Sequence, residues 1–194
     1  MAEVKVLIEG YAKEIKDGWL ASSAVTLIED NDKKIIVDPG CNRPKLLDEL
    51  KNNNLTPADI DFILLTHHHT DHILLTAIFE NAKVLNDTEL YENDKIIEHE
   101  NIIPGTDLKI IPTPGHDPFH CALIVPTKNG TYVVAGDVFW WMDDEEQKTD
   151  YESLINHPDP YVKDKKALEK SRKKILELAD FIIPGHGKMF KIKK

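Results

Sequence analysis

The segment Asp-Phe-Ile-Leu-Leu-Thr-His-His-His-Thr-Asp-His-Ile, residues 61–73, determines how the rest of the chain is interpreted. Its apolar run, Phe62–Leu65, is bounded by polar residues, which is typical of a buried strand. The run leads directly into four potential metal ligands: His67, His69, Asp71 and His72. Imidazole nitrogens and carboxylate oxygens are the donors that Zn²⁺ takes in catalytic sites. The segment therefore predicts a metal site at the rim of a sheet, although a solvated histidine-rich turn would have the same composition.

Three further candidate ligands repeat one pattern, in which an apolar run is followed by a small residue and then a polar side chain. His116 ends Thr-Pro-Gly-His, Asp137 ends Ala-Gly-Asp, and His186 lies in Pro-Gly-His-Gly. The preceding apolar runs are residues 108–111, 132–134 and 181–183. Glycine beside each ligand allows a tight turn at the sheet edge. Together with the first segment, these motifs predict one shared metal-binding cleft.

With these motifs the sequence resembles the metallo-β-lactamase superfamily. The family's H-x-H-x-D-H signature matches residues 67–72, and Val37-Asp38-Pro39-Gly40 is similar to its early strand-end aspartate. The resemblance covers nearly the whole chain. It implies an α/β protein with an αββα sandwich, and we expect residues 1–194 to form a single domain. Asp38 is implied to steady the loop that carries the ligands.

The resemblance also implies how the ligands are shared between two ions. A first metal is expected on His67, His69 and His116, and a second on Asp71, His72 and His186, with Asp137 bridging both. Two Zn²⁺ ions are expected, although Mn²⁺ or iron accepts the same donors. Such a pair can share a bridging hydroxide that is a nucleophile at neutral pH. Asp71 is implied to orient the attacking water.

Two other side chains are candidates for contact with substrate. His120 lies four residues after His116, so it can face the cleft and donate a proton to a leaving group. The alternative is a histidine that is satisfied by local hydrogen bonds. Trp19 either overhangs the metal site or packs on its own sheet, and both interpretations are open. His68, His99 and His157 have no evident partner and are expected at the surface or outside the ligand set.

Composition limits the class of protein. The chain has 194 residues, 41% of them hydrophobic, which is typical of a globular domain. No apolar run approaches the roughly 20 residues that span a bilayer, so no membrane partner is expected. The two cysteines are too few for a disulfide scaffold, and with no signal-peptide pattern they favour the cytoplasm. The net charge of −10 argues against a broad nucleic-acid-binding face.

Hydrophobic periodicity outlines alternating strands and helices. Strands are expected at residues 4–8, 24–29, 34–37, 62–65, 83–85, 108–111, 122–125, 132–134 and 181–183, and helices at 45–51, 73–79 and 160–179. In the last helix, Leu168, Ile175 and Leu178 are expected to face inward, with the basic residues, including Arg172, on the solvated face. The aromatic run 139–142 either lines the cleft or packs in the interior.

The predicted function is a binuclear zinc hydrolase that cleaves an ester, thioester, lactam or phosphodiester bond. Its substrate is expected to be a small molecule or RNA. Two alternatives are open: a mononuclear-iron sulfur dioxygenase of the same fold, which uses a similar histidine set, and a non-catalytic metal-dependent binding protein, for which a ligand is expected to be lost. The oligomeric state is open, and a homodimer is one arrangement consistent with the sequence.

Overall fold

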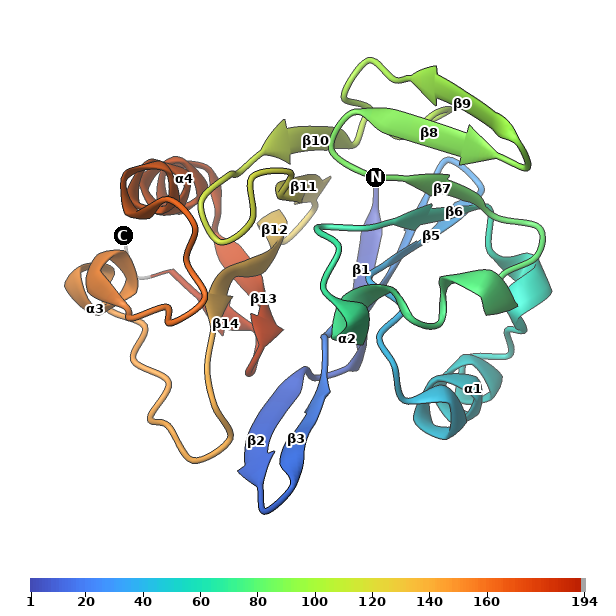
Figure 1. Cartoon of the computed structure of the whole chain (residues 1–194). Coiled ribbons are helices and arrows are strands. Elements are labelled where there is room, and N and C mark those ends of the chain that lie inside the picture. The colour runs from blue at the N-terminus through green and yellow to red at the C-terminus, as the bar shows by residue number, and fades with distance from the viewer. Residues whose placement is uncertain (193–194) are drawn as a thin grey trace.

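The computed structural model describes residues 1–192 and consists of two β-sheets packed face to face, with helices on both outer sides (Figure 1). The larger sheet has seven strands, in the order β1 (Glu3–Ile8), β4 (Val25–Asp30), β5 (Lys33–Val37), β6 (Phe62–Leu64), β7 (Lys83–Leu85), β8 (Glu89–Glu92) and β9 (Lys95–Glu98). The smaller has five, in the order β10 (Lys109–Pro112), β11 (Cys121–Thr127), β12 (Gly130–Trp140), β13 (Phe181–His186) and β14 (Phe190–Lys191). The expected αββα sandwich is confirmed.

The helices cover the outer face of each sheet. Helix α1 (Arg43–Asn52) and the short α2 (Thr70–Ile73) lie beside the larger sheet, and α3 (Tyr151–Asn156) and α4 (Lys165–Leu178) lie beside the smaller one (Figure 1). Two 3₁₀ turns, η1 (Pro57–Asp59) and η2 (Thr76–Ile78), complete the larger half. None of the helices among residues 1–192 is long and apolar enough to cross a membrane.

The core explains why the central strands are apolar along their whole length. Successive strand side chains point to opposite faces of a sheet. Ile35 therefore packs between the two sheets, whereas its neighbour Ile36 packs on the helical side with Leu46 of α1. In the smaller sheet, Ile183 packs between the sheets and Ile182 packs against α4. Both faces are covered, so an alternating apolar and polar pattern is absent from these strands.

Helix α4 corrects two expectations. It begins at Lys165, where the Asp164 side chain accepts hydrogen bonds from two amides of the first turn, and it ends at Leu178. Leu178 is 41% exposed, and Leu176 packs in the core in its place. Arg172 is not on the solvated face, because only 3% of it is exposed and its guanidinium donates to the carbonyl oxygens of Val138 and His157. Burial lowers the pKa of Arg172 to about 10, so it stays charged at neutral pH.

Other differences arise where the chain has little hydrophobic periodicity. The helix expected over residues 73–79 is instead split between α2 and η2. Residues 10–23 form a hairpin of strands β2 (Tyr11–Ile15) and β3 (Gly18–Ser22), which projects from one end of the sandwich (Figure 1). Strands β8 and β9, helix α3 and strand β14 were not expected from the pattern. Each of these elements has few buried residues, so the sequence signal for it is weak.

The expected strand at residues 132–134 extends through Asp137 to Trp140 as β12. It pairs in parallel with β13, and the register shifts at Gly136, where φ is +50°. A left-handed conformation favours glycine, so the bend next to Asp137 depends on this residue. Within the aromatic run, Phe139 and Trp141 are core residues. Trp140 points to the opposite face of the strand. Phe139 and Trp141 therefore pack in the interior, and Trp140 lines the cleft.

Candidate metal centre

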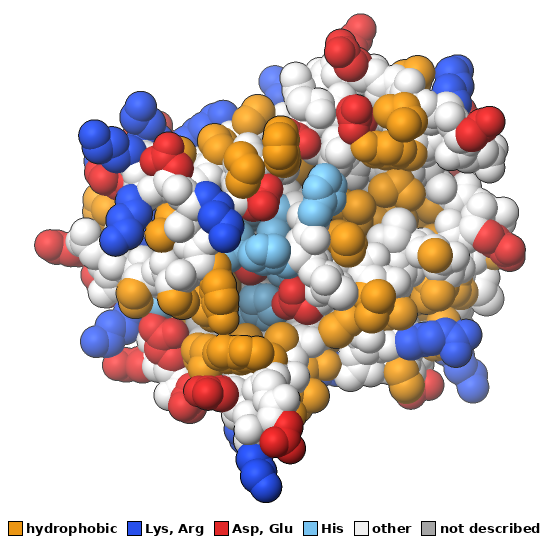
Figure 2. Space-filling model, in the orientation of Figure 1, with side chains coloured by type: hydrophobic (Ala, Val, Ile, Leu, Met, Phe, Trp, Pro, Cys, Tyr) orange, Lys and Arg blue, Asp and Glu red, His pale blue; other side chains and the backbone are white. Residues whose placement is uncertain are grey.

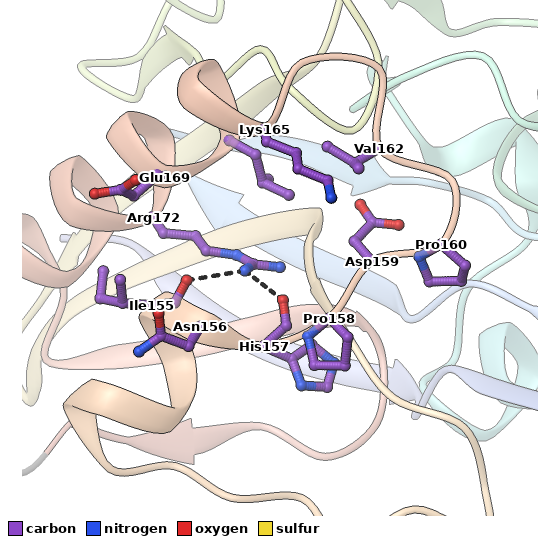
Figure 3. A pocket seen from close by; sticks show the side chains of 11 residues that line it. Ile155, Asn156, His157, Pro158, Asp159, Pro160, Val162, Lys165, Glu169 and Arg172 are labelled. Atoms are coloured by element: carbon purple, nitrogen blue, oxygen red, sulfur yellow. Dashed lines mark hydrogen bonds between the residues drawn. The ribbon is translucent and has the colours of Figure 1, made fainter.

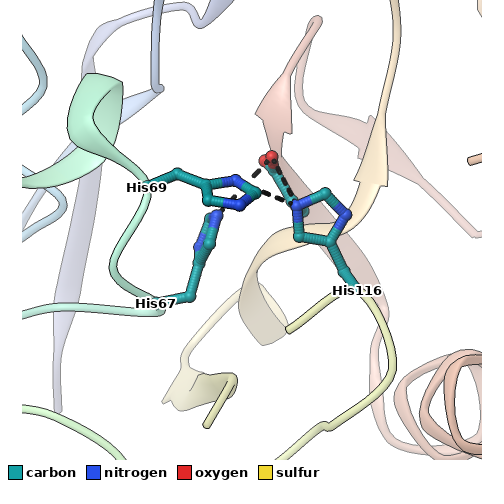
Figure 4. A group of neighbouring side chains, drawn as sticks. His67, His69 and His116 are labelled. Atoms are coloured by element: carbon teal, nitrogen blue, oxygen red, sulfur yellow. Dashed lines mark hydrogen bonds and ion pairs between the residues drawn. The ribbon is translucent and has the colours of Figure 1, made fainter. Parts of the chain in front are cut away.

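The seven predicted ligands converge at one edge of the two sheets. They form two groups, in each of which one ligand atom per residue lies within 4.8 Å of the others: His67, His69, His116 and Asp137, and then Asp71, His72 and His186. The rings of His67, His69 and His116 point toward one another in Figure 4. In Figure 2, histidines occupy a cleft bordered by hydrophobic side chains. The fold therefore joins ligands that lie up to 119 positions apart, from 67 to 186, in one place.

Hydrogen bonds at Nδ1 fix the orientation of four of the five histidines. The Nδ1–H of His67 donates to Thr66 Oγ1 at 3.0 Å, and that of His72 donates to Asp38 Oδ2 at 2.8 Å. His116 donates to Asp159 Oδ2 at 2.7 Å, and His186 to a backbone carbonyl, Tyr11 O, at 3.0 Å. In its neutral, metal-binding form, with the proton on Nδ1, each ring directs the lone pair of Nε2 toward the cluster. Outer partners of this kind set the tautomer of metal-binding histidines.

Asp38 holds the loop that carries the first ligands, as the sequence implied. Its Oδ1 accepts the Thr66 amide at 2.8 Å, and its Oδ2 accepts both the Thr66 hydroxyl at 2.7 Å and His72. Asp38 is 2% exposed and has a φ of +50°, a conformation that is uncommon for a residue other than glycine. Such strain is maintained where the surrounding contacts determine the position, which is common near functional sites.

Asp137 lies between the two groups. Its Oδ2 is 3.8 Å from His67 Nε2 and 3.5 Å from His116 Nε2. Its Oδ1 is 3.3 Å from His72 Nε2 and 3.7 Å from His186 Nε2. Burial raises the pKa of Asp137, but the nearby charges of His72 and His186 outweigh burial and hold the pKa well below its ordinary value. One carboxylate oxygen therefore faces each group, which is the geometry of a bridging ligand.

Several buried atoms of this cluster make no hydrogen bond, although they face one another across the site. His67 Nε2, His72 Nε2 and Asp137 Oδ1 are buried without a hydrogen bond, which is costly for polar groups. His69 Nδ1 and His116 Nε2 face each other at 3.2 Å, although His116 already has its proton on Nδ1. Burial and His116 lower the pKa of His69, which keeps its ring in the neutral form that binds metals. Cations between these atoms would satisfy them, so the residues present fit a metal centre.

His120 does not face the cleft, although its spacing from His116 had led us to expect that it could. It is 1% exposed, and its ring stacks on His67 with a centroid distance of 4.9 Å. Its Nδ1–H donates to Thr113 Oγ1, and its Nε2 accepts the Asp137 amide. Burial lowers the pKa of His120 to about 3, so the ring is neutral and has no proton free for a leaving group. The alternative, a histidine satisfied by local hydrogen bonds, describes this geometry.

The remaining histidines lie outside the ligand set. His68 is exposed, and His99 makes two local hydrogen bonds, as an acceptor from Asn101 N and through Nε2 with Asn86 O. His157 is not a surface residue, because its Nε2–H donates to Trp140 O at 2.6 Å and its ring lies beside Trp141. This bond ties the start of the loop after α3 to the end of β12, near the cluster.

A pocket of about 480 Å³ opens over ligands of both groups. His69, Asp71 and His186 lie at its base, and Trp19, Leu74, Trp140 and Tyr161 are among its walls. Trp19 is 51% exposed, so it does not pack on its own sheet. Trp19 instead projects from the β2–β3 hairpin over the metal centre, so the interpretation that it overhangs the metal site describes its position.

Sequence reasoning missed Asp159, which orients His116. Its side chain is 1% exposed and lies in the loop between α3 and α4, 43 positions away from its partner. Burial raises the pKa of Asp159, but the hydrogen bond from His116 outweighs burial and lowers it below the ordinary value. The loop has no motif and no periodicity, and an aspartate before a proline is common in turns. Only the folded chain identifies this residue.

Replacing Asp159 with Asn is expected to weaken metal binding at the first group by about 10–100-fold, as removal of an outer carboxylate does in other metal sites. The amide keeps the size of the side chain but loses the charge that orients His116. Competitive titration with a chromophoric chelator measures both affinities. The second group is expected to keep its affinity, and equal weakening of both groups would contradict this assignment. Asp164→Asn, which changes a helix cap instead, is the control.

Replacing Asp38 with Asn is expected to weaken binding at the second group by about 10–100-fold. Asparagine tolerates a positive φ, so this variant changes the charge while it keeps the backbone. Asp38→Ala additionally leaves the Thr66 amide without its partner, and a buried unsatisfied group costs about 1–3 kcal/mol of the free energy of unfolding. Chelator titration and urea denaturation separate the two effects. An Asn variant with unchanged affinity would show that Asp38 has no role in orienting His72.

The fold and the cluster together define a metal-binding protein of the αββα class, and comparisons with known proteins identify its family. The model of the Metallo-beta-lactamase superfamily matches residues 18–86. Metallo-beta-lactamase domain-containing protein 1 of Xenopus laevis is 36% identical over 202 residues, which cover 98% of this chain and 82% of that protein. The crystal structure of a Thermotoga maritima protein, described as a putative metallo-beta-lactamase, has a TM-score of 0.74 at 22% identity, covering 98% of this chain and 99% of that one. The chain belongs to the metallo-β-lactamase superfamily.

Solved structures with this fold hold different metals. A dizinc quorum-quenching lactonase has a TM-score of 0.64 at 15% identity, covering 92% of this chain and 78% of that one. A di-iron-bound protein has a TM-score of 0.59 at 23% identity, covering 87% and 89%. In the present chain the two adjacent groups indicate a binuclear metal centre. A His/Asp metal cluster in this fold indicates a metal-dependent hydrolase.

Proposed function

We propose that the chain is a cytoplasmic, binuclear zinc hydrolase that adds water to the carbonyl carbon of a small molecule. The observation that supports this most is the position of Asp137, which directs one carboxylate oxygen to each of two histidine groups at the base of an open pocket. Both cysteines are free, which is consistent with a reducing compartment.

The ligand groups would hold two ions, one on His67, His69 and His116 and one on Asp71, His72 and His186, with Asp137 between them. Two such ions lower the pKa of water toward neutrality and stabilise negative charge on the oxygen of the bond that is cleaved. The chain supplies the orientation, because the partners at Nδ1 fix four rings before substrate binds.

Asp71 is the carboxylate best placed to orient the attacking water. Its side chain is 29% exposed at the base of the pocket, and its Oδ2 lies 3.2 Å from His186 Nε2. Burial raises the pKa of Asp71, but the hydrogen bond with His186 and the charge of His72 outweigh burial and lower it. The carboxylate is therefore ionised at neutral pH and can accept a hydrogen bond from water. His120 is omitted from this proposal because it does not reach the pocket.

Metal analysis combined with an activity screen tests the proposal. Full-length protein purified without chelator is expected to contain two equivalents of metal, one for each ligand group. It is expected to hydrolyse at least one ester, thioester or lactam, to lose this activity on dialysis against a chelator, and to regain it with Zn²⁺. One iron per chain with oxygen uptake would instead identify a dioxygenase. Bound metal without turnover would identify a binding protein.

A further inference from the structure

Among residues 1–192, no cationic side chain lines the pocket over the metal centre. Its lining contains no lysine or arginine, and its only acidic residue is Asp71, which already belongs to the ligand groups. Apart from the ligands, the walls are apolar or small: aromatic rings at Trp19, Trp140 and Tyr161, an aliphatic side chain at Leu74, two alanines, Cys41 and Thr70. Ligand sites of this kind bind by apolar contact and use few polar groups for orientation.

Two of the aromatic rings, those of Trp140 and Tyr161, form a continuous wall beside the ligand His186. The Trp140 ring lies 6.2 Å from the His186 ring and 5.8 Å from the Tyr161 ring, measured between centroids. Tyr161 is 44% exposed, and Leu74 is 59% exposed. These surfaces remain open to water beside the metal centre, so a substrate that covers them would remove apolar area from water.

Two cationic side chains of helix α4 line a different cavity. Lys165 and Arg172 line a separate cavity of about 440 Å³ on the side of Asp159 and His157 (Figure 3). The guanidinium of Arg172 is engaged there, because its Nη1 donates to the carbonyl oxygens of Ile155 and His157. An anionic group on the acyl part, away from the ions that the ligand groups would hold, would therefore have no cationic side chain among the described wall residues to pair with. Burying an unpaired charge is costly.

We propose that this pocket selects an uncharged carboxylic ester, thioester or lactone whose acyl part is apolar and of the size of an aromatic ring. This inference rests on the proposed hydrolase function. A phosphodiester has no acyl part to occupy these walls, and a carboxylate-bearing acyl group would place its charge against them, away from the ions. In the reaction, water adds to the acyl carbon, and the bond from this carbon to the leaving oxygen or sulfur breaks. One proton of the water passes to the leaving group. The carboxylic acid that forms releases its proton to the solvent, so no further reactant is needed.

The probes are three nitrophenyl compounds with the same chromophore: 4-nitrophenyl phenylacetate, 4-nitrophenyl hydrogen succinate and bis(4-nitrophenyl) phosphate. The first carries a neutral aromatic acyl group, the second a carboxylate, and the third is a phosphodiester. Metal-loaded full-length protein is expected to hydrolyse the phenylacetate with a kcat/KM at least about 10-fold above that of the other two, relative to their rates in buffer. Quenching of tryptophan fluorescence by phenylacetanilide, with and without metal, measures binding independently of turnover.

Substitutions in the pocket walls test whether these residues cause the preference for the phenylacetate. Trp19→Ala and Tyr161→Ala are expected to lower kcat/KM for the phenylacetate about 10-fold or more, because the lost rings contact only the acyl group. The matched controls are Leu20→Ala, which alters the neighbouring exposed residue of β3, and Tyr151→Ala, which removes an exposed tyrosine from α3. Neither control residue lines the pocket. Leu74→Arg adds a cation to the wall and is expected to shift the preference toward the succinate.

The outcomes separate this inference from the proposed hydrolase. Faster cleavage of the succinate or the phosphodiester by the unaltered protein would overturn the neutral-substrate inference and leave the hydrolase standing. Equal losses in the control variants would overturn the role of the aromatic wall. Failure of the metal-loaded protein to cleave any ester, thioester, lactone, lactam or phosphodiester in a broad screen would overturn both proposals. Preference for the phenylacetate that depends on Trp19 and Tyr161, with phenylacetanilide quenching weakened in Tyr161→Ala, is the supporting result.

Discussion

Replacing Asp137 with Ala is expected to reduce turnover to the uncatalysed rate and to lower metal occupancy at both groups. Each carboxylate oxygen faces a different set of histidines, at 3.3 Å from His72 Nε2 on one side and 3.5 Å from His116 Nε2 on the other. In the described part of the chain, no other carboxylate directs one oxygen to each of the two groups. Inductively coupled plasma analysis of the purified variant measures the metal, and the ester assay measures the turnover.

The matched control is Asp48→Ala, which removes an exposed carboxylate from α1 and is expected to change neither quantity. Asp137→Asn is a sharper variant, because it keeps the size of the side chain and one oxygen but removes the charge. It is expected to retain more metal than the Ala variant and still to lose most turnover. Unchanged activity in Asp137→Ala would show that the two groups do not act as one centre.

The ligands could be predicted from the sequence because each one is coupled to a local pattern. His67 and His69 follow a buried strand directly, and Asp137 and His186 lie beside glycines at or near the ends of strands that pair in parallel. Parallel strands bring their carboxyl ends to the same edge of a sheet, so residues at these ends meet without any further information. The central strands were predicted for a related reason, since both of their faces are buried.

The partners that orient the ligands could not be predicted in the same way. Asp159 lies in an irregular loop, and the partner of His186 is a backbone carbonyl, Tyr11 O, which has no sequence signature. His120 shows the opposite error: its spacing from His116 suggested a shared face, but its bonds to Thr113 and the Asp137 amide turn it into the interior. Arg172 was misplaced because a buried arginine satisfied by carbonyls has the same helical spacing as a solvated one.

Replacing Gly185 with Ala is expected to have an effect nearly as large as removing Asp137 itself. A Cβ at this position would lie 1.7 Å from Asp137 Oδ1, far inside any permitted contact. Gly185 does not have a positive φ, so the substitution adds volume without a conformational penalty. The carboxylate would have to rotate away from His72 and His186, and metal at the second group is expected to fall while the ligand residues themselves are all present.

A double-mutant cycle distinguishes this local effect from general damage to the fold. If Gly185→Ala acts by displacing the carboxylate, it should cost little additional metal affinity once Asp137 has been replaced with Ala, because the displaced group is already absent. Additive losses would instead show that β13 itself has moved, since the Gly185 carbonyl also accepts the Ala24 amide at 2.7 Å. Thermal unfolding of the metal-free variants measures that second effect directly. Gly185, the first glycine of Pro-Gly-His-Gly, is then explained by the space that the carboxylate of Asp137 on the neighbouring strand requires. The flexibility of a turn does not explain it.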